Sequence, residues 1–295
     1  MINNKPKVSI GMPVYNGEKY LRQSLGALVS QSFIDFELII SDNASTDKSR
    51  DICMEYCEQD DRIKYFLQPT NIGPWLNFKY VLDKAQGDYF MWTAADDIRS
   101  SDFVELNYNF LSLNSEYVAS TCPNIFEGDS LEDGNFTGFS LNENENYKRY
   151  VKFFNYCWHS HGTFYSLIRI NELKECSLIH GSPVFFGIDW CVDLFLASRG
   201  KINCTVKGYT IFGIDGDSQN PNYHKRIRTS YLEYLMPFYQ LNKYVIYLSK
   251  PLSLKKRARI IIILARLNIL VSYGRFKTQL KQLFSYNKLE IQYHL

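Results

Sequence analysis

Residues 8–49 read VSIGMPVYNGEKYLRQSLGALVSQSFIDFELIISDNASTDKS, and this stretch decides the fold. A short apolar, β-branched run from Lys7 to Met12 is ended by Pro13, so a buried strand is predicted there. From Glu18 to Ser32 the leucines recur at helical spacing, and Phe36 to Ser41 (FELIIS) predicts a second buried strand. The stretch is therefore a strand, a crossover helix and a second strand, the unit from which parallel sheets are built.

The same alternation continues toward the middle of the chain. The further elements predicted from it are a helix from Ser45 to Glu58, a strand from Ile63 to Leu67, a helix from Pro74 to Ala85, a strand from Tyr89 to Thr93, a helix from Asp102 to Leu113 and a strand from Val118 to Pro123. Strands that alternate with helices indicate an α/β fold with a mainly parallel, Rossmann-like sheet flanked by helices.

The pattern is weaker in the second half. Glu127 to Asn146 is predicted to be a surface excursion, Thr163 to Arg169 a strand, and Asp189 to Ser198 a helix that ends at Gly200. Beyond about Tyr223 the composition predicts helices only. We expect an α/β domain over residues 1–225, with halves at 1–110 and 111–225, and a helical C-terminal extension over 226–295.

Composition excludes several classes of protein. The chain has 295 residues, and its 33 basic and 31 acidic side chains give a net charge of +2, which removes the bulk electrostatic argument for a nucleic-acid partner. Its seven cysteines do not indicate a disulfide framework. No signal peptide and no run of 18 apolar residues is visible. We therefore expect a cytoplasmic protein with reduced thiols, soluble or peripheral to the inner face of the plasma membrane.

Polar side chains follow three of the predicted strands. Tyr15 and Asn16 follow the first, Asp42 the second, and Asp96 with Asp97 the fourth. The carboxyl ends of parallel strands meet at one edge of a sheet, where ligands bind. Two adjacent carboxyls repel each other, and a hard divalent cation shared with phosphate oxygens relieves that repulsion. Because the chain has neither G-x-G-x-x-G nor G-x-x-x-x-G-K-[ST], a nucleotide diphosphate held through a metal remains the favoured ligand.

Residues 8–49, together with NIGPWLNFKYVLDKAQGDYFMWTAADD at 71–97, resemble the nucleotide-sugar half of family 2 glycosyltransferases, which have the GT-A fold. The resemblance is close over about residues 7 to 110 and thin over about 160 to 220. It implies that the donor nucleotide is bound by Pro13, Tyr15, Asn16, Asp42, Asn71, Gly73 and Asp96. In this arrangement Tyr15 stacks on uracil, Asp42 accepts a hydrogen bond from the N–H of the base, and Asn71 with Gly73 shapes the pocket wall.

The same resemblance implies a metal site. Asp96 and Asp97 match the acidic metal motif of the family, although Ala94 stands where that motif has its first aspartate. A site with so few carboxylates suits Mn²⁺ or Mg²⁺, which retain waters and bind substrate phosphate. Which of the two residues binds the metal, and which contacts ribose, stays open.

The resemblance also implies a general base, Asp189, at the start of a helix. Ile188 replaces the glutamate that usually precedes it, and a helix N-cap is the alternative interpretation of Asp189. Trp190 and His161 are candidate contacts for the acceptor, or alternatively ordinary packed side chains. The segment Gly213 to Gln219 is loosely similar to a family loop that closes over the diphosphate. The four basic residues after it are either phosphate contacts or a solvated basic turn, namely His224, Lys225, Arg226 and Arg228.

The predicted reaction moves a hexosyl or N-acetylhexosaminyl group from a nucleotide diphosphate sugar, expected to be UDP-linked, to the hydroxyl of a saccharide or lipid-linked saccharide. By resemblance it is metal-dependent and inverting, and it serves bacterial surface polysaccharide synthesis. The alternatives are a sugar-phosphate nucleotidylyltransferase and a non-catalytic nucleotide-sugar-binding protein. The basic C-terminal helix either lies on an anionic membrane as a peripheral contact or packs its apolar stripe on the main domain.

Overall fold

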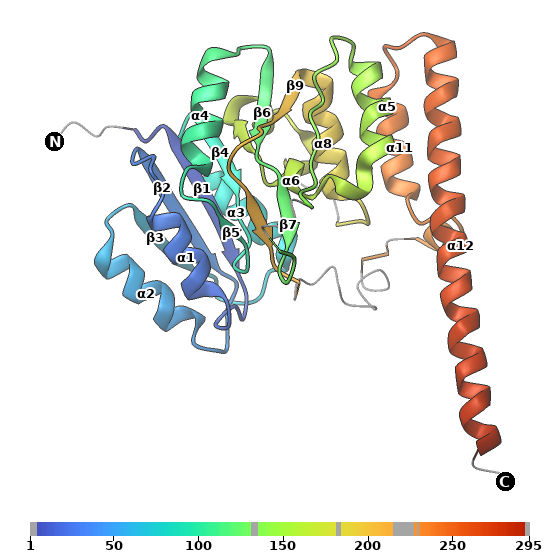
Figure 1. Cartoon of the computed structure of the whole chain (residues 1–295), viewed down its shortest axis with the longest axis horizontal. Helices are drawn as coiled ribbons and strands as arrows, with labels where there is room; N and C mark the ends of the chain where they lie inside the picture. Colours follow the sequence, from blue (N-terminus) through green and yellow to red (C-terminus); the bar gives the residue numbers. More distant parts are fainter. Residues whose placement is uncertain (1–4, 131–134, 181–183, 215–226, 229, 293–295) are drawn as a thin grey trace.

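The computed structural model describes residues 5–130, 135–180, 184–214, 227–228 and 230–292, with side chains up to residue 274 in the last helix. Its main sheet has seven strands in the order β3-β2-β1-β4-β8-β6-β9 (Figure 1). Its first four strands in the chain run parallel to one another: β1 (Val8–Val14), β2 (Phe36–Asp42), β3 (Ile63–Leu67) and β4 (Tyr89–Trp92). The predicted mainly parallel α/β sheet is confirmed.

Short strands complete this sheet and form a second one. β8 (Leu167–Arg169) is antiparallel to both β4 and β6 (Tyr117–Thr121), and β9 (Lys201–Cys204) runs parallel to β6. A three-stranded sheet contains β5 (Ile98–Arg99), β10 (Thr210–Phe212) and β7 (Asn124–Phe126). Because β10 pairs with β5, it brings the chain after residue 210 next to the loop that follows β4.

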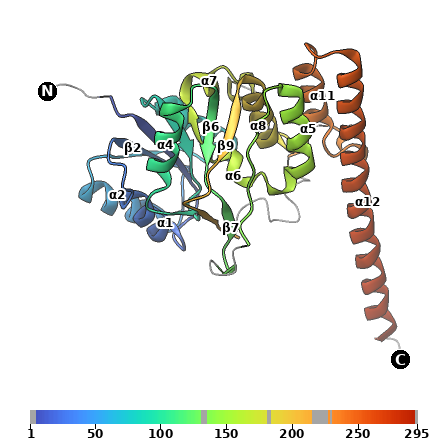
Figure 2. The ribbon, with the colours of Figure 1, turned by 45° about the horizontal axis from the view of Figure 1, so that its top comes forward.

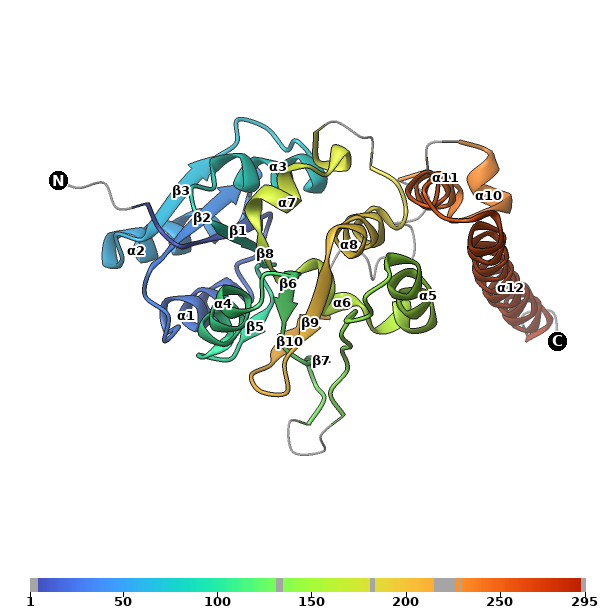
Figure 3. The ribbon, with the colours of Figure 1, turned by 90° about the horizontal axis from the view of Figure 1, so that it is seen from above.

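Helices cover the sheet on two sides. α1 (Leu21–Val29), α2 (Ser49–Gln59) and α4 (Phe103–Leu113) share one core with β1 and β2. α3 (Pro74–Lys84) shares a second core with α5 (Asn146–Tyr156) and α8 (Ile188–Arg199). Figure 3 shows α1 and α4 on one side of the strands and α3 on the other. Short helices α6 (His161–Phe164) and α7 (Ile170–Lys174) flank β8.

Several predicted boundaries were wrong, among them three starts of elements. α2 begins at Ser49 instead of Ser45, whose hydroxyl accepts a hydrogen bond from the backbone N–H of Asn16 (2.9 Å). α1 begins at Leu21 instead of Glu18, and a turn precedes it in which the backbone N–H of Glu18 donates to Asp47 (3.0 Å). The strand predicted from Thr163 begins only at Leu167, since Thr163 lies in α6 and a turn follows it.

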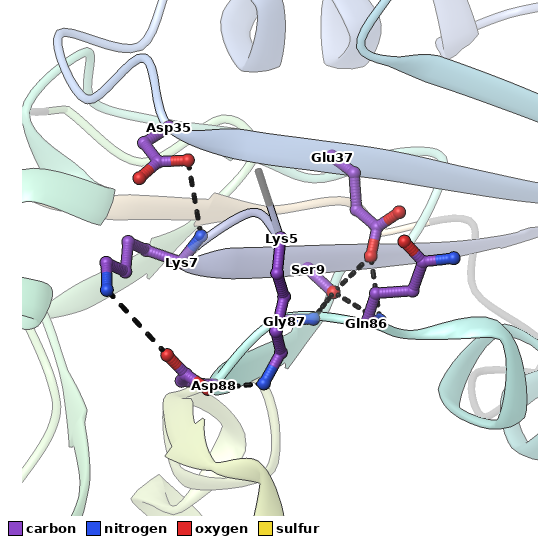
Figure 4. A network of polar contacts seen from close by, with 8 residues as sticks. All are labelled: Lys5, Lys7, Ser9, Asp35, Glu37, Gln86, Gly87 and Asp88. Carbon is purple, nitrogen blue, oxygen red and sulfur yellow. Dashed lines mark hydrogen bonds and ion pairs between the residues drawn. The ribbon is translucent and has the colours of Figure 1, made fainter. Parts of the chain in front are cut away.

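A buried polar network fixes the amino-terminal ends of the central strands (Figure 4). The Glu37 side chain in β2 is almost completely buried and accepts hydrogen bonds from the Ser9 hydroxyl (2.6 Å), the backbone N–H of Gln86 (2.8 Å) and the Lys64 ammonium (2.6 Å). The Ser9 hydroxyl in turn accepts from the backbone N–H of Gly87 (2.8 Å). These bonds hold the segment before β4 against β1, at the end of the sheet opposite the candidate site.

The predicted helical extension is confirmed over the part of the chain that the structure describes. It consists of α10 (Leu232–Leu235), α11 (Tyr239–Leu248) and α12 (Leu254–Gln292). Phe238, Leu241 and Leu264 lie in the same core as α5 and α8, so these helices pack on the main body. The second half of α12 projects past the rest of the molecule (Figure 2). Among the described residues, none of the helices has the length and apolarity needed to cross a membrane.

Candidate active site

The loops after β1 and β2 are joined by hydrogen bonds at the carboxyl edge of the sheet. The Asn16 side chain accepts from the backbone N–H of Thr46 (2.8 Å), and the Ser49 hydroxyl accepts from the backbone N–H of Gly17 (2.8 Å). Asn16 has a φ of 51°, a left-handed conformation that asparagine adopts more readily than most residues. The two loops therefore form one unit, beside which the Tyr15 side chain is 51% exposed and Pro13 is partly buried.

Asp42, at the end of β2, is completely buried. One of its carboxylate oxygens accepts from the backbone N–H of Ser45 (2.8 Å) and the other accepts from the Tyr65 hydroxyl (2.7 Å). Burial and this hydrogen bond raise the pKa of Tyr65 well above its ordinary value. The structure thus gives Asp42 a part in holding its own loop, and contact with a nucleobase stays a prediction.

The loop after β3 joins the same edge through two asparagines. The side-chain oxygen of Asn71 accepts hydrogen bonds from the Asn43 side-chain amide (3.0 Å) and from the backbone N–H of Gly73 (2.9 Å). Gly73 has a φ of 84° and precedes α3, a conformation that favours glycine. Asn71 and Gly73 therefore lie at the same edge of the sheet as Asp42, and their part in a pocket wall stays a prediction. Asn43, which links the two loops, was not among the predicted residues.

The loop after β4 brings the paired aspartates to this edge. A Cβ placed on Gly17 would lie 3.3 Å from the Cβ of Ala95, so the loops after β1 and β4 are in contact. Asp97 is 4% exposed, and its carboxylate accepts from the backbone N–H of Ala94 (3.3 Å). Burial raises the pKa of Asp97 to about 7, the neighbouring Asp96 raises it further, and the Arg99 guanidinium opposes the shift. The raised pKa of Asp97 agrees in direction with the repulsion between the two adjacent carboxyls that was expected from the sequence. Burial is the larger cause of this raised pKa.

Gly213 lies directly against Asp96. A Cβ on Gly213 would overlap the Asp96 carboxyl group, so only glycine leaves this carboxyl its place. Gly213 follows β10, and therefore the segment that resembles a diphosphate loop starts beside the aspartate pair. Its residues 215–219, and the predicted phosphate contacts His224, Lys225 and Arg226, lie outside the described residues. Arg228 is described, and its guanidinium lies 4.0 Å above the Tyr234 ring.

The described residues contain no group of three or more histidine, cysteine or acidic side chains able to hold a metal ion. Asp96 and Asp97 are the two carboxylates at this edge of the sheet that the resemblance assigns to a metal. Two carboxylates fit Mn²⁺ or Mg²⁺ only if phosphate oxygens and waters supply the remaining ligands, which is the usual arrangement of these ions with nucleotides. The two aspartates therefore fit a metal ion that binds together with a diphosphate.

Asp189 is the second residue of α8 and is exposed to solvent. Nevertheless, desolvation by the surrounding protein raises the pKa of its carboxyl, against hydrogen bonds from the backbone of the first helical turn. The N-cap of α8 is Gly187, with a φ of 85°, so the alternative interpretation of Asp189 as the cap is wrong.

Asp193 lies one turn after Asp189 on the same helix and has the opposite environment. It is 1% exposed, and neither of its carboxyl oxygens has a hydrogen-bond partner among the described residues. Burial, with a smaller contribution from Asp189, raises the pKa of Asp193 well above its ordinary value. Asp193 is therefore a neutral acid inside the core, and the sequence pattern gave no sign of it.

Tyr165 connects the two acidic groups of the site. Its pKa is raised well above the ordinary value by burial first and then by Asp97, Asp96 and Asp189. Tyr165 is therefore within electrostatic reach of carboxyls from both the β4 loop and α8. The Tyr165 ring also lies 5.7 Å from the Phe212 ring, just before Gly213. The sequence analysis missed Tyr165, and only its place next to the predicted His161 could have drawn attention to it.

Trp190 and His161 lie in aromatic surroundings. The Trp190 ring stacks on Phe238 (5.3 Å between centroids) and meets Trp158 edge-on (5.3 Å). The His161 ring meets Phe126 edge-on (5.1 Å), and although the residue is exposed to solvent, partial desolvation by nearby protein lowers the pKa of His161. Both residues are packed and partly accessible, and a contact with an acceptor stays a prediction for each.

Comparisons with known proteins show the family and the fold of the chain. The sequence model of the family described as glycosyl transferase family 2 matches residues 9–170, more than half of the chain. An uncharacterized glycosyltransferase of Haemophilus influenzae is 43% identical over 111 residues, which are 38% of this chain and 44% of that protein. The chain thus covers less than half of that relative's length.

Two solved structures are similar in fold. Residues 1–349 of TarS from S. aureus, in complex with UDP, superpose with a TM-score of 0.63 at 18% identity over 88% of this chain and 70% of that one. TarS has also been solved with UDP-GlcNAc. The mannosyltransferase PcManGT of Pyrobaculum calidifontis, with GDP-Man and Mn²⁺, gives a TM-score of 0.51 at 16% identity over 96% of this chain and 81% of that one. The predicted GT-A fold is confirmed.

Proposed function

Because the chain belongs to glycosyl transferase family 2, we propose that it is a glycosyltransferase that uses a UDP-sugar donor and transfers a hexosyl or N-acetylhexosaminyl group. The acceptor in this proposal is a hydroxyl of a saccharide or lipid-linked saccharide used for bacterial surface polysaccharides. The observation that carries the proposal is that the loops after β1, β2 and β4 meet at one edge of the sheet, where Gly213 lies against Asp96. The UDP and UDP-GlcNAc complexes of TarS support the choice of nucleotide.

In the proposed donor site, the nucleotide lies along the joined loops after β1, β2 and β3. The exposed Tyr15 ring offers a flat face to uracil, and Asn16 and Pro13 border it. The Asp42 carboxylate has lone pairs beyond its two hydrogen bonds, but it is completely buried, so accepting from the N–H of the base requires a local shift of the loop after β2. Asn71 and Gly73 form the wall of this pocket.

The diphosphate lies at the loop after β4 and at Gly213. Asp96 and Asp97 would hold Mn²⁺ or Mg²⁺, and the bound ion would stabilise the negative charge that develops on the leaving diphosphate. Asp96 is more accessible than the buried Asp97, so we assign the direct contact with the ion to Asp96 and a supporting one to Asp97. The Mn²⁺ in the PcManGT complex supports a divalent ion in this fold.

Asp189 acts as the general base. Its carboxylate takes the proton of the acceptor hydroxyl while that oxygen forms a bond to the anomeric carbon, and the bond from this carbon to the diphosphate oxygen breaks. A single displacement of this kind inverts the anomeric centre and releases UDP. The partly accessible Trp190 and His161 border the acceptor. The reaction takes place in the cytoplasm, at the inner face of the membrane where a lipid-linked acceptor would lie.

The test is UDP release from a panel of UDP- and GDP-sugars, with and without Mn²⁺ or Mg²⁺ and with simple sugar acceptors. We expect release from a UDP-sugar that depends on the ion. The donor should still protect the Asp189→Asn variant against thermal unfolding. The rate of sugar transfer by this variant should fall by about 10² to 10⁴-fold.

Asp193→Asn is the matched control, because it makes the same change one turn away on α8 at a residue inside the core. This variant should retain glycosyl transfer. Equal loss of donor binding and transfer in Asp189→Asn would refute the assignment of the base. Donor binding without release under every condition would favour the non-catalytic alternative.

A further inference from the structure

The C-terminal segment has a charge that the rest of the chain lacks. Residues 250–289 contain ten lysine and arginine residues and no acidic residue, whereas the remainder of the chain has 23 basic and 31 acidic residues. The small overall charge of +2 therefore hides a strongly basic segment beside an acidic body. A segment of this kind attracts an anionic surface.

One side of α12 packs on the protein body. Ile260, Leu264 and Leu267 are almost completely buried and belong to the core shared with α5 and α8. Lys256 on the same side pairs with Glu145 (2.5 Å). This side confirms the interpretation in which an apolar stripe of the helix packs on the main domain.

The other side of α12 carries a second stripe with no cover among the described residues. Its members are spaced alternately by four and three residues, which keeps them on one face of a helix. They are Lys255, Arg259, Ile262, Arg266, Ile269 and Tyr273. Ile262 is 67% exposed, Ile269 68% and Tyr273 66%, so this stripe presents large apolar side chains between basic ones.

α10 extends the exposed apolar surface. The Ser272 hydroxyl donates to the backbone carbonyl of Leu235 (3.3 Å), which places α10 next to α12. Leu235 is 77% exposed, and Tyr231 and Tyr234 are 91% and 61% exposed. Tyrosine, with its apolar ring and polar hydroxyl, is enriched where proteins meet the headgroup region of membranes. Figure 3 shows α10 and α12 together at one end of the molecule, away from β1 to β3.

We propose that this face of α10 and α12 binds the surface of an anionic lipid bilayer, with the isoleucines and tyrosines in the headgroup region and the basic residues on lipid phosphates. Charge favours this occupant over a second copy of the chain. If two copies of α12 packed in parallel and in register, Arg259 and Arg266 of one copy would lie against the same arginines of the other. The described stripe has no acidic residue to neutralise this positive charge. Lipid binding needs no sugar donor or acceptor, so it is tested independently of glycosyl transfer.

The experiment is co-sedimentation of the full chain with phosphatidylcholine vesicles and with vesicles containing about 30% phosphatidylglycerol, at low and high salt, without nucleotide. We expect binding to the anionic vesicles that weakens with salt and is at least about tenfold weaker in Arg259→Glu/Arg266→Glu. Ile262→Ser/Ile269→Ser should also weaken binding. Lys207→Glu, an exposed basic residue far from α12 in the sequence, is the control and should bind like the wild type.

Circular dichroism and UDP release with a water-soluble acceptor show that the variants are folded. Equal binding to neutral and anionic vesicles, or unchanged binding of the double arginine variant, would overturn the proposal. The proposal would also be overturned if the wild type did not bind vesicles but formed dimers in light scattering. A second copy of the chain would then be the partner that covers this face.

Discussion

Replacing Asp193 with asparagine should stabilise the protein by an amount that grows with pH. The Asp193 carboxyl is buried without a hydrogen-bond partner among the described residues, so it folds in its neutral form and its pKa is raised. In the unfolded chain an aspartate ionises near pH 3.9. Above that pH folding must take up a proton, and the wild type therefore loses stability as the pH rises toward the folded-state pKa.

The size of this effect follows from proton linkage. One proton taken up on folding lowers the free energy of unfolding by at most about 1.4 kcal/mol per pH unit. Asparagine has the same size and cannot ionise, so Asp193→Asn removes this slope. Between pH 5 and pH 7 the stability difference between the variant and the wild type should thus increase by up to about 2.7 kcal/mol. Below about pH 4 the difference should no longer change with pH.

Urea unfolding at several pH values from 4 to 8 measures this difference. Asp61→Asn, which changes an exposed aspartate, serves as the control and should show a far smaller dependence on pH. If the stabilisation by Asp193→Asn were the same at pH 5 and pH 8, the Asp193 carboxyl would not be neutral in the folded protein. The interpretation that Asp193 of α8 is buried as an uncharged acid would then be refuted.

Three further predictions concern the site. Gly213→Ala should displace the Asp96 carboxyl and lower kcat/KM on the order of 10²-fold with little change in melting temperature, measured by UDP release and thermal unfolding. Tyr165→Phe keeps the aromatic contacts but removes a buried hydroxyl within electrostatic reach of Asp96, Asp97 and Asp189, so kcat/KM should fall by about tenfold or more, and unchanged kinetics would remove Tyr165 from the site. Burial raises the pKa of Asp189, so kcat should decline, as the pH falls, at a pH above the ordinary carboxyl range; a decline only near pH 4 would contradict this.

The first hundred residues were predictable because their periodicity is long and strong. β1 to β4 and the helices between them appear near their predicted positions, and the polar ends of these strands meet at one edge, as strand direction requires. The errors at the starts of α1 and α2 have a single cause. Ser45, Thr46 and Glu18 were taken as helix-starting residues, whereas they hydrogen-bond to the neighbouring loop.

The second half was less predictable because its decisive features depend on tertiary contacts. β5, β9 and β10 contain two to four residues each, too few for a periodic pattern. Only β10 brings Gly213 to Asp96, and only the packing of α6 against α8 brings Tyr165 near Asp189. The same holds for Asp189 and Asp193, which the sequence presents as equivalent and the fold places in opposite environments.

The hydrogen bonds between the loops after β1, β2 and β3 have a consequence for ligand affinity. Asn16, Asn43 and Asn71 hold these loops to one another through hydrogen bonds within the protein. The conformational entropy of these loops is thus lost during folding, and in the proposed donor site a nucleotide would meet a surface that is largely pre-organised. We therefore expect UDP to bind on this side with the three loops still held to one another.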